Sequence, residues 1–331
     1  MVIETGEETS RSTSRFRAAL RNYGPWVAAV FIFVWISQSV SFAEAWAAAR
    51  QADLLTFGAA VGAAVIWWFM LDSRAYAYLF TNLNTPVSWA EACSLRALTY
   101  LVTPINWNLG TAAIVLHLRQ SKGIGAVEST SSVLVYSVID GLIMGGLFAG
   151  SMRFVPDSPQ LAVAAKWVLA FVGSQAALML VVMSNIGRAR WLEKLRSFPI
   201  LQSWRRIRFR TIGVLLAIRS AYFSGFVLLY WWGARSFGVD VPFAYAAATM
   251  PIIQGSAALP ITPGGLGTQQ AVMLQFYAPF GPESAILAFG VAFPVAIILG
   301  RILIGSLYIR DLAEFRRVRA EAESSAALAE S

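Results

Sequence analysis

The stretch LTFGAAVGAAVIWWFML, residues Leu55–Leu71, contains no charged side chain. Four further runs are nearly free of charge: Val27–Ser37, Ser132–Ala149, Ala162–Met183 and Ile286–Leu299. Runs of about 20 apolar residues are long enough to cross the hydrocarbon core of a bilayer as helices. The whole chain is 57% hydrophobic and 13% charged, whereas soluble domains carry about 25% charged residues. We therefore expect an all-α, polytopic membrane protein.

Composition also excludes several classes of function. The formal net charge is +8, but no soluble basic domain is present to carry it, so we expect no nucleic-acid partner. A single cysteine, Cys93, excludes an intrachain disulfide and a cysteine-based metal cluster, and a single histidine, His117, excludes a His-rich site. The sequence contains no P-loop, zinc motif or Ser/His/Asp set. We expect a protein that is not an enzyme and has no metal or cofactor.

Six full spans are expected, at 26–43, 54–71, 130–151, 161–184, 211–233 and 284–308. Cytoplasmic loops are enriched in Lys and Arg, which orients the spans. The segments expected inside hold 19 basic residues and those expected outside hold three. The inside segments are 1–24, 72–88, 119–125, 185–210 and 310–331. The outside segments are 43–53, 152–160 and 234–241. Both termini are thus expected in the cytoplasm, and the chain in the cytoplasmic membrane.

Two further apolar segments, 88–118 and 242–280, are interrupted by Pro, Gly and Asn. The first break reads Thr103-Pro-Ile-Asn-Trp-Asn-Leu-Gly-Thr111. The second reads Leu259-Pro-Ile-Thr-Pro-Gly-Gly-Leu-Gly-Thr268. The charge asymmetry holds only if each interrupted segment returns to the side from which it came. We therefore expect two re-entrant helical hairpins that enter the membrane from opposite faces.

The two halves of the chain then mirror each other. Each contains two spans, one hairpin and a third span, which predicts inverted repeats at about 25–152 and 160–309. The expected organisation is a cytoplasmic tail at 1–24, one transmembrane domain at 25–309 and a charged tail at 310–331. Interrupted segments at corresponding positions of two halves are the best sequence indicator of a transporter's binding site.

Each break is expected to precede a short helix, starting near Ala112 and near Gln269, with the Thr111 and Thr268 hydroxyls as caps. A helix N-terminus binds anions because its N–H groups are free and its partial charge is positive. Glycines in the second break would let a headgroup approach the backbone. Alternatively, they only permit tight helix packing or a kink. The candidate substrate-binding residues at the breaks are Asn106, Asn108, Gly110, Thr111, Pro263, Gly264, Gly265, Gly267, Thr268, Gln269 and Gln270.

Charged side chains also occur within the apolar segments. Arg96, Arg219 and Arg301 are expected at one depth in the cytoplasmic half of the membrane. Asp140 is expected near the middle of its span. An arginine at the centre of a membrane helix costs at least about 2.5 kcal/mol, so its presence indicates a role. We expect a polar cavity for an anionic headgroup, because the planar fork of arginine bonds two phosphate oxygens. The alternatives are snorkelling, or a structural ion pair between Asp140 and one arginine.

The segment Pro260–Gln270 resembles the C-terminal motif of the lysylphosphatidylglycerol synthase transmembrane, or flippase-like, family. In that family a glutamate usually follows the Pro/Gly run, and an arginine lies on the final span. This chain has Gln270 in place of the glutamate, while Arg301 matches the arginine. The resemblance covers the chain from around residue 20 to around residue 310.

The family's N-terminal motif is matched less closely. Asn106, Asn108 and Gly110 fit it, Thr111 replaces its glutamate, and Asp140 fits loosely. Since both glutamates of the family are replaced, any proton or cation coupling that they provide is not expected to carry over unchanged.

The resemblance implies an inverted-repeat helical fold and movement of a lipid between leaflets. We expect a flippase for an anionic phospholipid or a polyprenyl-phosphate-linked lipid, with a homo-oligomer as a possible assembly. No soluble aminoacyl-transfer domain occurs in this sequence, so lipid aminoacylation is not expected. Two alternatives stay open. One is a non-transporting partner of a lipid- or glycan-modifying enzyme, and the other is a small membrane enzyme acting on a lipid carrier.

Overall fold

The computed structural model describes residues 42–103, 107–155, 159–183, 193–194, 197–258 and 267–308. These residues form eleven α-helices joined by short 3-10 helices, turns and loops. The expected span at 26–43 lies almost entirely outside the described residues, as do both expected tails. The chain is an integral, multi-pass membrane protein with an all-helical fold.

Five helices are long and apolar enough to cross a bilayer. They are α3 (Leu54–Leu83), α6 (Ala126–Ser151), α7 (Pro159–Met183), α10 (Phe209–Arg235) and α13 (Glu283–Leu307). The shorter helices are α2 (Phe42–Gln51), α4 (Trp89–Val102), α5 (Trp107–Lys122), α9 (Gln202–Arg206), α11 (Phe243–Ala258) and α12 (Thr268–Tyr277). Five of the six expected spans therefore correspond to long helices.

Helix α3 is longer than expected. It begins at Leu54, because the Asp53 carboxylate accepts hydrogen bonds from the N–H groups of Leu55 and Thr56. It continues past residue 71 to Leu83, so most of the segment expected as the loop 72–88 is helical. The span was expected to end at residue 71 because the next residue, Asp72, is charged. This prediction was wrong, since the Asp72 side chain lies inside the bundle.

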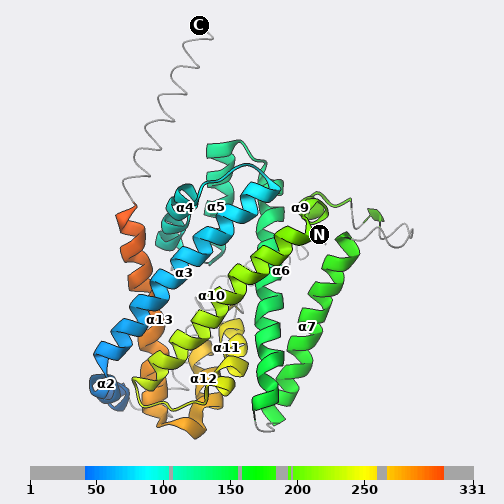
Figure 1. Ribbon diagram of the computed structural model, residues 1–331. Helices are drawn as coiled ribbons and strands as arrows, with labels where there is room; N and C mark the ends of the chain where they lie inside the picture. Colours follow the sequence, from blue (N-terminus) through cyan, green and yellow to red (C-terminus); the bar gives the residue numbers. More distant parts are fainter. Residues whose placement is uncertain are drawn as a thin grey trace, which may run out of the picture.

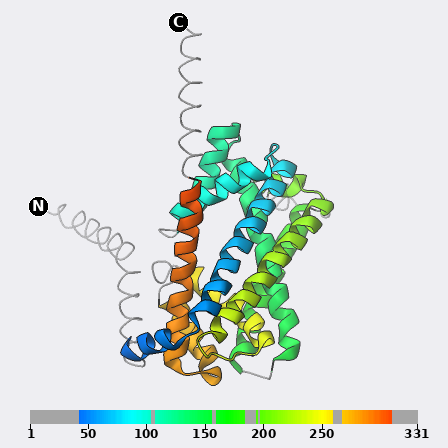
Figure 2. The same ribbon diagram turned by 60° about the vertical axis from the view of Figure 1, so that its left-hand side comes forward.

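Helices α3 and α10 pack along each other through the centre of the bundle (Figure 1). Helix α13 lies on one side of this pair, and α6 and α7 lie on the other. The chain leaves α3 at one end of the bundle, forms α4 and α5, which pack on each other, and enters α6 at that same end (Figures 1 and 2). We call this the α4–α5 end.

Helices α11 and α12 also pack on each other, and they lie toward the opposite end of the bundle, where α10 ends and α13 begins (Figure 1). We call this the α11–α12 end. Helices α4, α5, α11 and α12 contain 14, 16, 16 and 10 residues. At about 1.5 Å per residue, each is too short to cross a core of about 30 Å alone.

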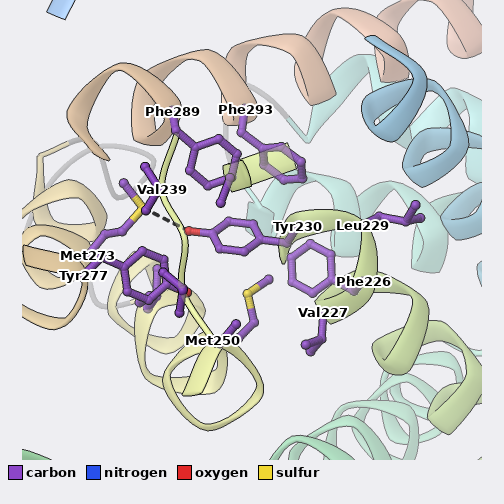
Figure 3. Packing of buried hydrophobic residues seen from close by; sticks show 14 of the residues in the cluster. Phe226, Val227, Leu229, Tyr230, Val239, Met250, Met273, Tyr277, Phe289 and Phe293 are labelled. Atoms are coloured by element: carbon purple, nitrogen blue, oxygen red, sulfur yellow. Dashed lines mark hydrogen bonds between the residues drawn. The ribbon is translucent and has the colours of Figure 1, made fainter. Parts of the chain in front are cut away.

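An aromatic cluster fixes α12 against the long helices. The Tyr230 ring on α10 packs edge-on against Phe289 and Phe293 of α13, with centroid distances of 4.9 and 5.1 Å. Its hydroxyl lies 3.0 Å from the sulfur of Met273 on α12, to which it donates (Figure 3). Offset and edge-to-face aromatic pairs add to the stabilisation from area burial. The cluster therefore holds α12 in a defined position beside α10 and α13.

Candidate functional site

A layer of buried charge lies in the centre of the bundle, and Asp72 of α3 is its central residue. Arg96 of α4 places Nη2 at 2.5 Å from Asp72 Oδ2, and Arg219 of α10 places Nη1 at 2.6 Å from Oδ1. The hydroxyl of Tyr136 on α6 also donates to Oδ1. Asp72 is 1% exposed. A single carboxylate thus joins four helices.

Arg219 also binds Asp140 of α6. Its Nε lies 2.5 Å from Oδ1 and its Nη2 lies 2.8 Å from Oδ2. Two parallel bonds of this kind are the strong, directional form of an arginine–carboxylate pair. The Asp140 side chain is 24% exposed, whereas Arg219 is buried. The structure therefore shows the ion pair that was the alternative to a binding role for Asp140.

Aromatic rings surround the buried guanidinium groups. The guanidinium carbon of Arg219 lies 3.8 Å from the ring centroid of Tyr222 and 4.6 Å from that of Tyr136. The corresponding carbon of Arg96 lies 4.9 Å from the Tyr100 centroid. The negative face of an aromatic ring attracts a cation, most strongly where water is excluded. The rings thus help to replace the hydration that both arginines lose.

Arg301 of α13 is the third arginine beside this layer. Its guanidinium carbon lies 5.2 Å from the Tyr100 centroid and 5.8 Å from the Trp68 centroid. Arg96 and Arg301 therefore contact the same ring, that of Tyr100. Among the described residues Arg301 forms no ion pair, and its buried Nε has no hydrogen-bond partner.

The formal charges in this region do not balance. Asp72 and Asp140 together match the charges of Arg96 and Arg219. One positive charge is therefore in excess among the described residues, and Arg301 is the arginine that forms no ion pair there. The three arginines lie near one another, because Arg96 and Arg219 share Asp72 and Arg96 and Arg301 share the Tyr100 ring. Sequence reasoning missed Asp72, although the apolar spacing of Tyr76, Leu79, Phe80 and Leu83 continues the helix beyond it and was the available signal.

The first break does not form the expected cap. Helix α5 begins at Trp107, so Thr111 lies inside it and the start expected near Ala112 was wrong. The helix begins within the break, four residues before Thr111, which leaves Thr111 no free helix start to cap. Pro104, Ile105 and Asn106 lie outside the described residues.

Gly110 lies at a close approach between α4 and α5. A Cβ at this position would be 2.7 Å from Cγ2 of Thr103, which is closer than side chains pack. The absence of a side chain at Gly110 therefore permits the close packing of α4 and α5. The side chain of Asn108 lies outside the described residues.

At the second break, Gly267 occupies the N-cap position of α12 with φ of 85°. A residue with a side chain rarely adopts this left-handed conformation, so glycine takes the turn and Thr268 becomes the first helical residue. The prediction that Thr268 caps the helix was wrong for this reason. The expected headgroup contacts of Pro263, Gly264 and Gly265 lie outside the described residues.

Neutral amide side chains replace charge in this second region. Gln270 accepts a hydrogen bond from the Gly267 N–H at 2.8 Å and donates one to the Gly290 carbonyl of α13 at 2.9 Å. Gln269 donates to the Gln254 amide oxygen of α11 at 2.5 Å. We call Gln254, Gln269 and Gln270 the amide region. These bonds connect α12 to its two neighbours and do not involve the charge layer.

The match to known families comes from the whole membrane domain. A family model described as the lysylphosphatidylglycerol synthase TM region matches residues 23–305. The matched segment contains the charge layer, the amide region and both helix breaks. No curated protein matches the chain.

Proposed function

Because the chain belongs to the family of lysylphosphatidylglycerol synthase transmembrane regions, we propose that it is a flippase-like transporter. It moves an anionic, phosphate-bearing lipid between the leaflets of the cytoplasmic membrane. The description of the family names the membrane part of a phospholipid-modifying enzyme, which favours a lipid as the substrate. The chemistry of the site favours a lipid with negative charge.

The observation that carries this proposal is the unmatched charge of Arg301. A guanidinium inside a membrane protein is costly unless a counter-charge and hydrogen-bond acceptors are supplied. Among the described residues Arg301 forms no ion pair, its buried Nε has no hydrogen-bond partner, and its guanidinium contacts the rings of Trp68 and Tyr100. A phosphate supplies both, since two of its oxygens can accept from one guanidinium. We assign Arg301 as the phosphate ligand.

Arg96 and Arg219 have a different role in this proposal. Both are neutralised by carboxylates in this conformation, so they hold α3, α4, α6 and α10 together rather than contact the lipid. Asp72, Arg96 and Asp140 belong to the first half of the chain, and Arg219 belongs to the second. Rocking of one half against the other would therefore act on the pairs made by Arg219.

The arrangement of the short helices supports alternating access. Two pairs of helices too short to span the membrane lie toward opposite ends of the bundle, as two re-entrant hairpins in inverted repeats would. The α4–α5 end carries the basic residues Arg119, Lys122, Arg205, Arg206 and Arg208. The α11–α12 end carries Arg50, Arg153 and Arg235. We therefore place the α4–α5 end and the termini in the cytoplasm.

A leaflet-resolved assay in proteoliposomes tests the proposal. Fluorescent anionic phospholipid, polyprenyl phosphate and zwitterionic phospholipid are compared for wild type, Arg301→Gln and Arg301→Lys. Arg301→Gln is expected to slow transport of the phosphate-bearing anionic lipid by at least about tenfold, the effect of losing a charge-assisted contact. Arg301→Lys should retain part of the rate because the charge remains.

Arg235→Gln is the matched control, because Arg235 is an exposed arginine at the α11–α12 end. Unchanged transport by folded Arg301→Gln protein would contradict the assignment of Arg301 as the phosphate ligand. Absence of transport by the wild type would contradict the proposal and favour a non-transporting partner of another enzyme.

A further inference from the structure

A cleft of about 300 Å³ lies between α4 and α5, and the charge layer does not use it. Its walls are mostly apolar and include Leu95 and Leu98 of α4 and Leu118 of α5. Its volume is within the range of small-ligand pockets. Arg96 points from α4 to Asp72 on α3, so α4 separates the cleft from the buried charges. The cleft is thus a second candidate site.

An acid and a base lie side by side at the mouth of the cleft. Lys122 Nζ of α5 is 2.6 Å from Glu91 Oε1 of α4. Both side chains are accessible, with 27% and 47% of their surface exposed. Exposed ion pairs contribute little to stability, so replacing one partner by a ligand of the same charge has a small cost.

The carboxylate at the mouth is held in a fixed orientation. Glu91 Oε2 accepts a hydrogen bond from the Ser88 N–H at 2.8 Å, and Ser88 Oγ accepts one from the Glu91 N–H at 3.2 Å. This reciprocal capping box fixes the start of α4. It also directs the other oxygen, Oε1, toward Lys122. A cation that entered the cleft would meet an oriented acceptor.

We propose that this cleft binds a zwitterionic phospholipid whose headgroup carries a primary ammonium. The ammonium binds Glu91 Oε1, the phosphate binds Lys122, and one acyl chain lies along Leu95 and Leu98. The site differs from the one assigned to Arg301, and its occupancy does not depend on transport.

Two features of the mouth select this lipid class. An anionic lipid without an ammonium would leave Glu91 facing a phosphate, and like charges repel. A quaternary ammonium has no N–H to donate to Oε1, so it forgoes a charge-assisted hydrogen bond. Trp89, which precedes the lining residues Ala90 and Glu91 in the sequence, is exposed and suits the membrane interface, where headgroups lie. An ethanolamine-type headgroup fits best.

Equilibrium binding to the delipidated full-length protein in detergent micelles tests this site. The probes are phosphatidylethanolamine, phosphatidylcholine and phosphatidylglycerol with identical acyl chains. Wild type is expected to bind phosphatidylethanolamine most tightly. Glu91→Gln should weaken that binding by about tenfold and remove the preference over phosphatidylcholine, as expected for losing a hydrogen bond to a charged group. Glutamine still completes the capping box, so α4 should remain folded.

Two further variants separate the headgroup from the acyl chain. Leu98→Trp fills the apolar part of the cleft and should weaken binding of all three lipids. Arg206→Gln removes the exposed Arg206–Glu128 pair outside the cleft and should change nothing. Equal wild-type affinity for the ethanolamine and choline lipids, or unchanged binding by Glu91→Gln, would overturn the proposal. Arg301→Gln should leave this binding intact, so the two proposals fail separately.

Discussion

Asp72 in the charge layer contacts two arginines and a tyrosine, whereas Gln270 in the amide region bonds only to backbone groups. Both regions place polar side chains inside an apolar bundle, where each polar atom needs a partner. The charge layer meets this need with formal charges that depend on each other. The amide region meets it with neutral groups, each of which has its own partner.

The two regions also connect different parts of the chain. In the charge layer, Arg219 of the second half binds Asp72 and Asp140 of the first half. In the amide region, all bonded groups belong to α11, α12, α13 and the turn before α12. The contact between the two halves should therefore be sensitive to the loss of single charges. The packing of α12 against α11 and α13 depends on no ion pair in the amide region, so it should be insensitive to the loss of charges in the charge layer.

The largest effect is expected from Asp72→Asn. This change keeps the shape of the side chain but leaves two buried arginines with one remaining carboxylate, Asp140. Removing one partner of a buried pair typically costs about 3–5 kcal/mol. We expect a large fall in the midpoint of thermal unfolding in detergent. The double variant Asp72→Asn, Arg96→Gln should recover part of the loss, and an unchanged midpoint for the single variant would refute the central role of Asp72.

A smaller effect is expected from Gln270→Ala in the amide region. It leaves the buried Gly267 N–H and Gly290 carbonyl without their side-chain partner, at a cost of about 1–3 kcal/mol. The loss should be the same at pH 5 and pH 8, because no group in this region titrates. Thermal unfolding at both pH values measures it. If Gln270→Ala lowered the stability as much as Asp72→Asn, buried amides and buried charges would be equally important for stability, contrary to this comparison.

Gln270→Glu sharpens the comparison by introducing a group that titrates. A protonated carboxyl can accept from the Gly267 N–H and donate to the Gly290 carbonyl, as the amide does. The ionised form would place a negative charge against that carbonyl oxygen without a counter-charge. Stability should therefore be near wild type at low pH and fall as the pH rises. A pH-independent unfolding midpoint for this variant would show that water reaches Gln270.

These regions also show what the sequence can and cannot predict. The expected apolar spans predicted five of the helices, and charge within the apolar segments indicated Arg96, Arg219 and Arg301. Asp72 was missed, because a charged residue after an apolar run resembles the end of a span, and its compensation by arginines from other helices is not visible along the chain. The amide at position 270 was evident, but its bond to Gly290 depends on how α12 packs against α13.

The turn before α12 gives the next smaller effect. Gly267→Ala forces an alanine into a left-handed conformation, at a cost of about 1–2 kcal/mol. Gly62→Ala is the matched control, since a Cβ at Gly62 meets nothing within 4 Å and the residue is helical. The control should be neutral or slightly stabilising, because alanine has the higher helix propensity. Equal unfolding midpoints for the two variants would argue against a strained turn at Gly267.

The smallest effect on stability should come from the exposed ion pair of Lys122 and Glu91. Comparing it with the charge layer tests whether burial, rather than charge itself, makes stability depend on each ion-pair partner. The hydrogen bond from Lys122 is the largest cause that holds the pKa of Glu91 below its usual value. A carboxyl with a lowered pKa stabilises the fold above its unfolded pKa, and this contribution disappears as the pH falls through the folded value. Solvent screening limits the contribution to about 1 kcal/mol or less.

Lys122→Gln should therefore lower the unfolding midpoint slightly at pH 7 and not at all at pH 3, and added salt should reduce the difference. Asp72→Asn should be insensitive to salt, because its ion pairs lie where mobile ions do not reach. If Lys122→Gln were as damaging as Asp72→Asn, charge at either location would be equally important, and the distinction between buried and exposed pairs would not hold for this bundle.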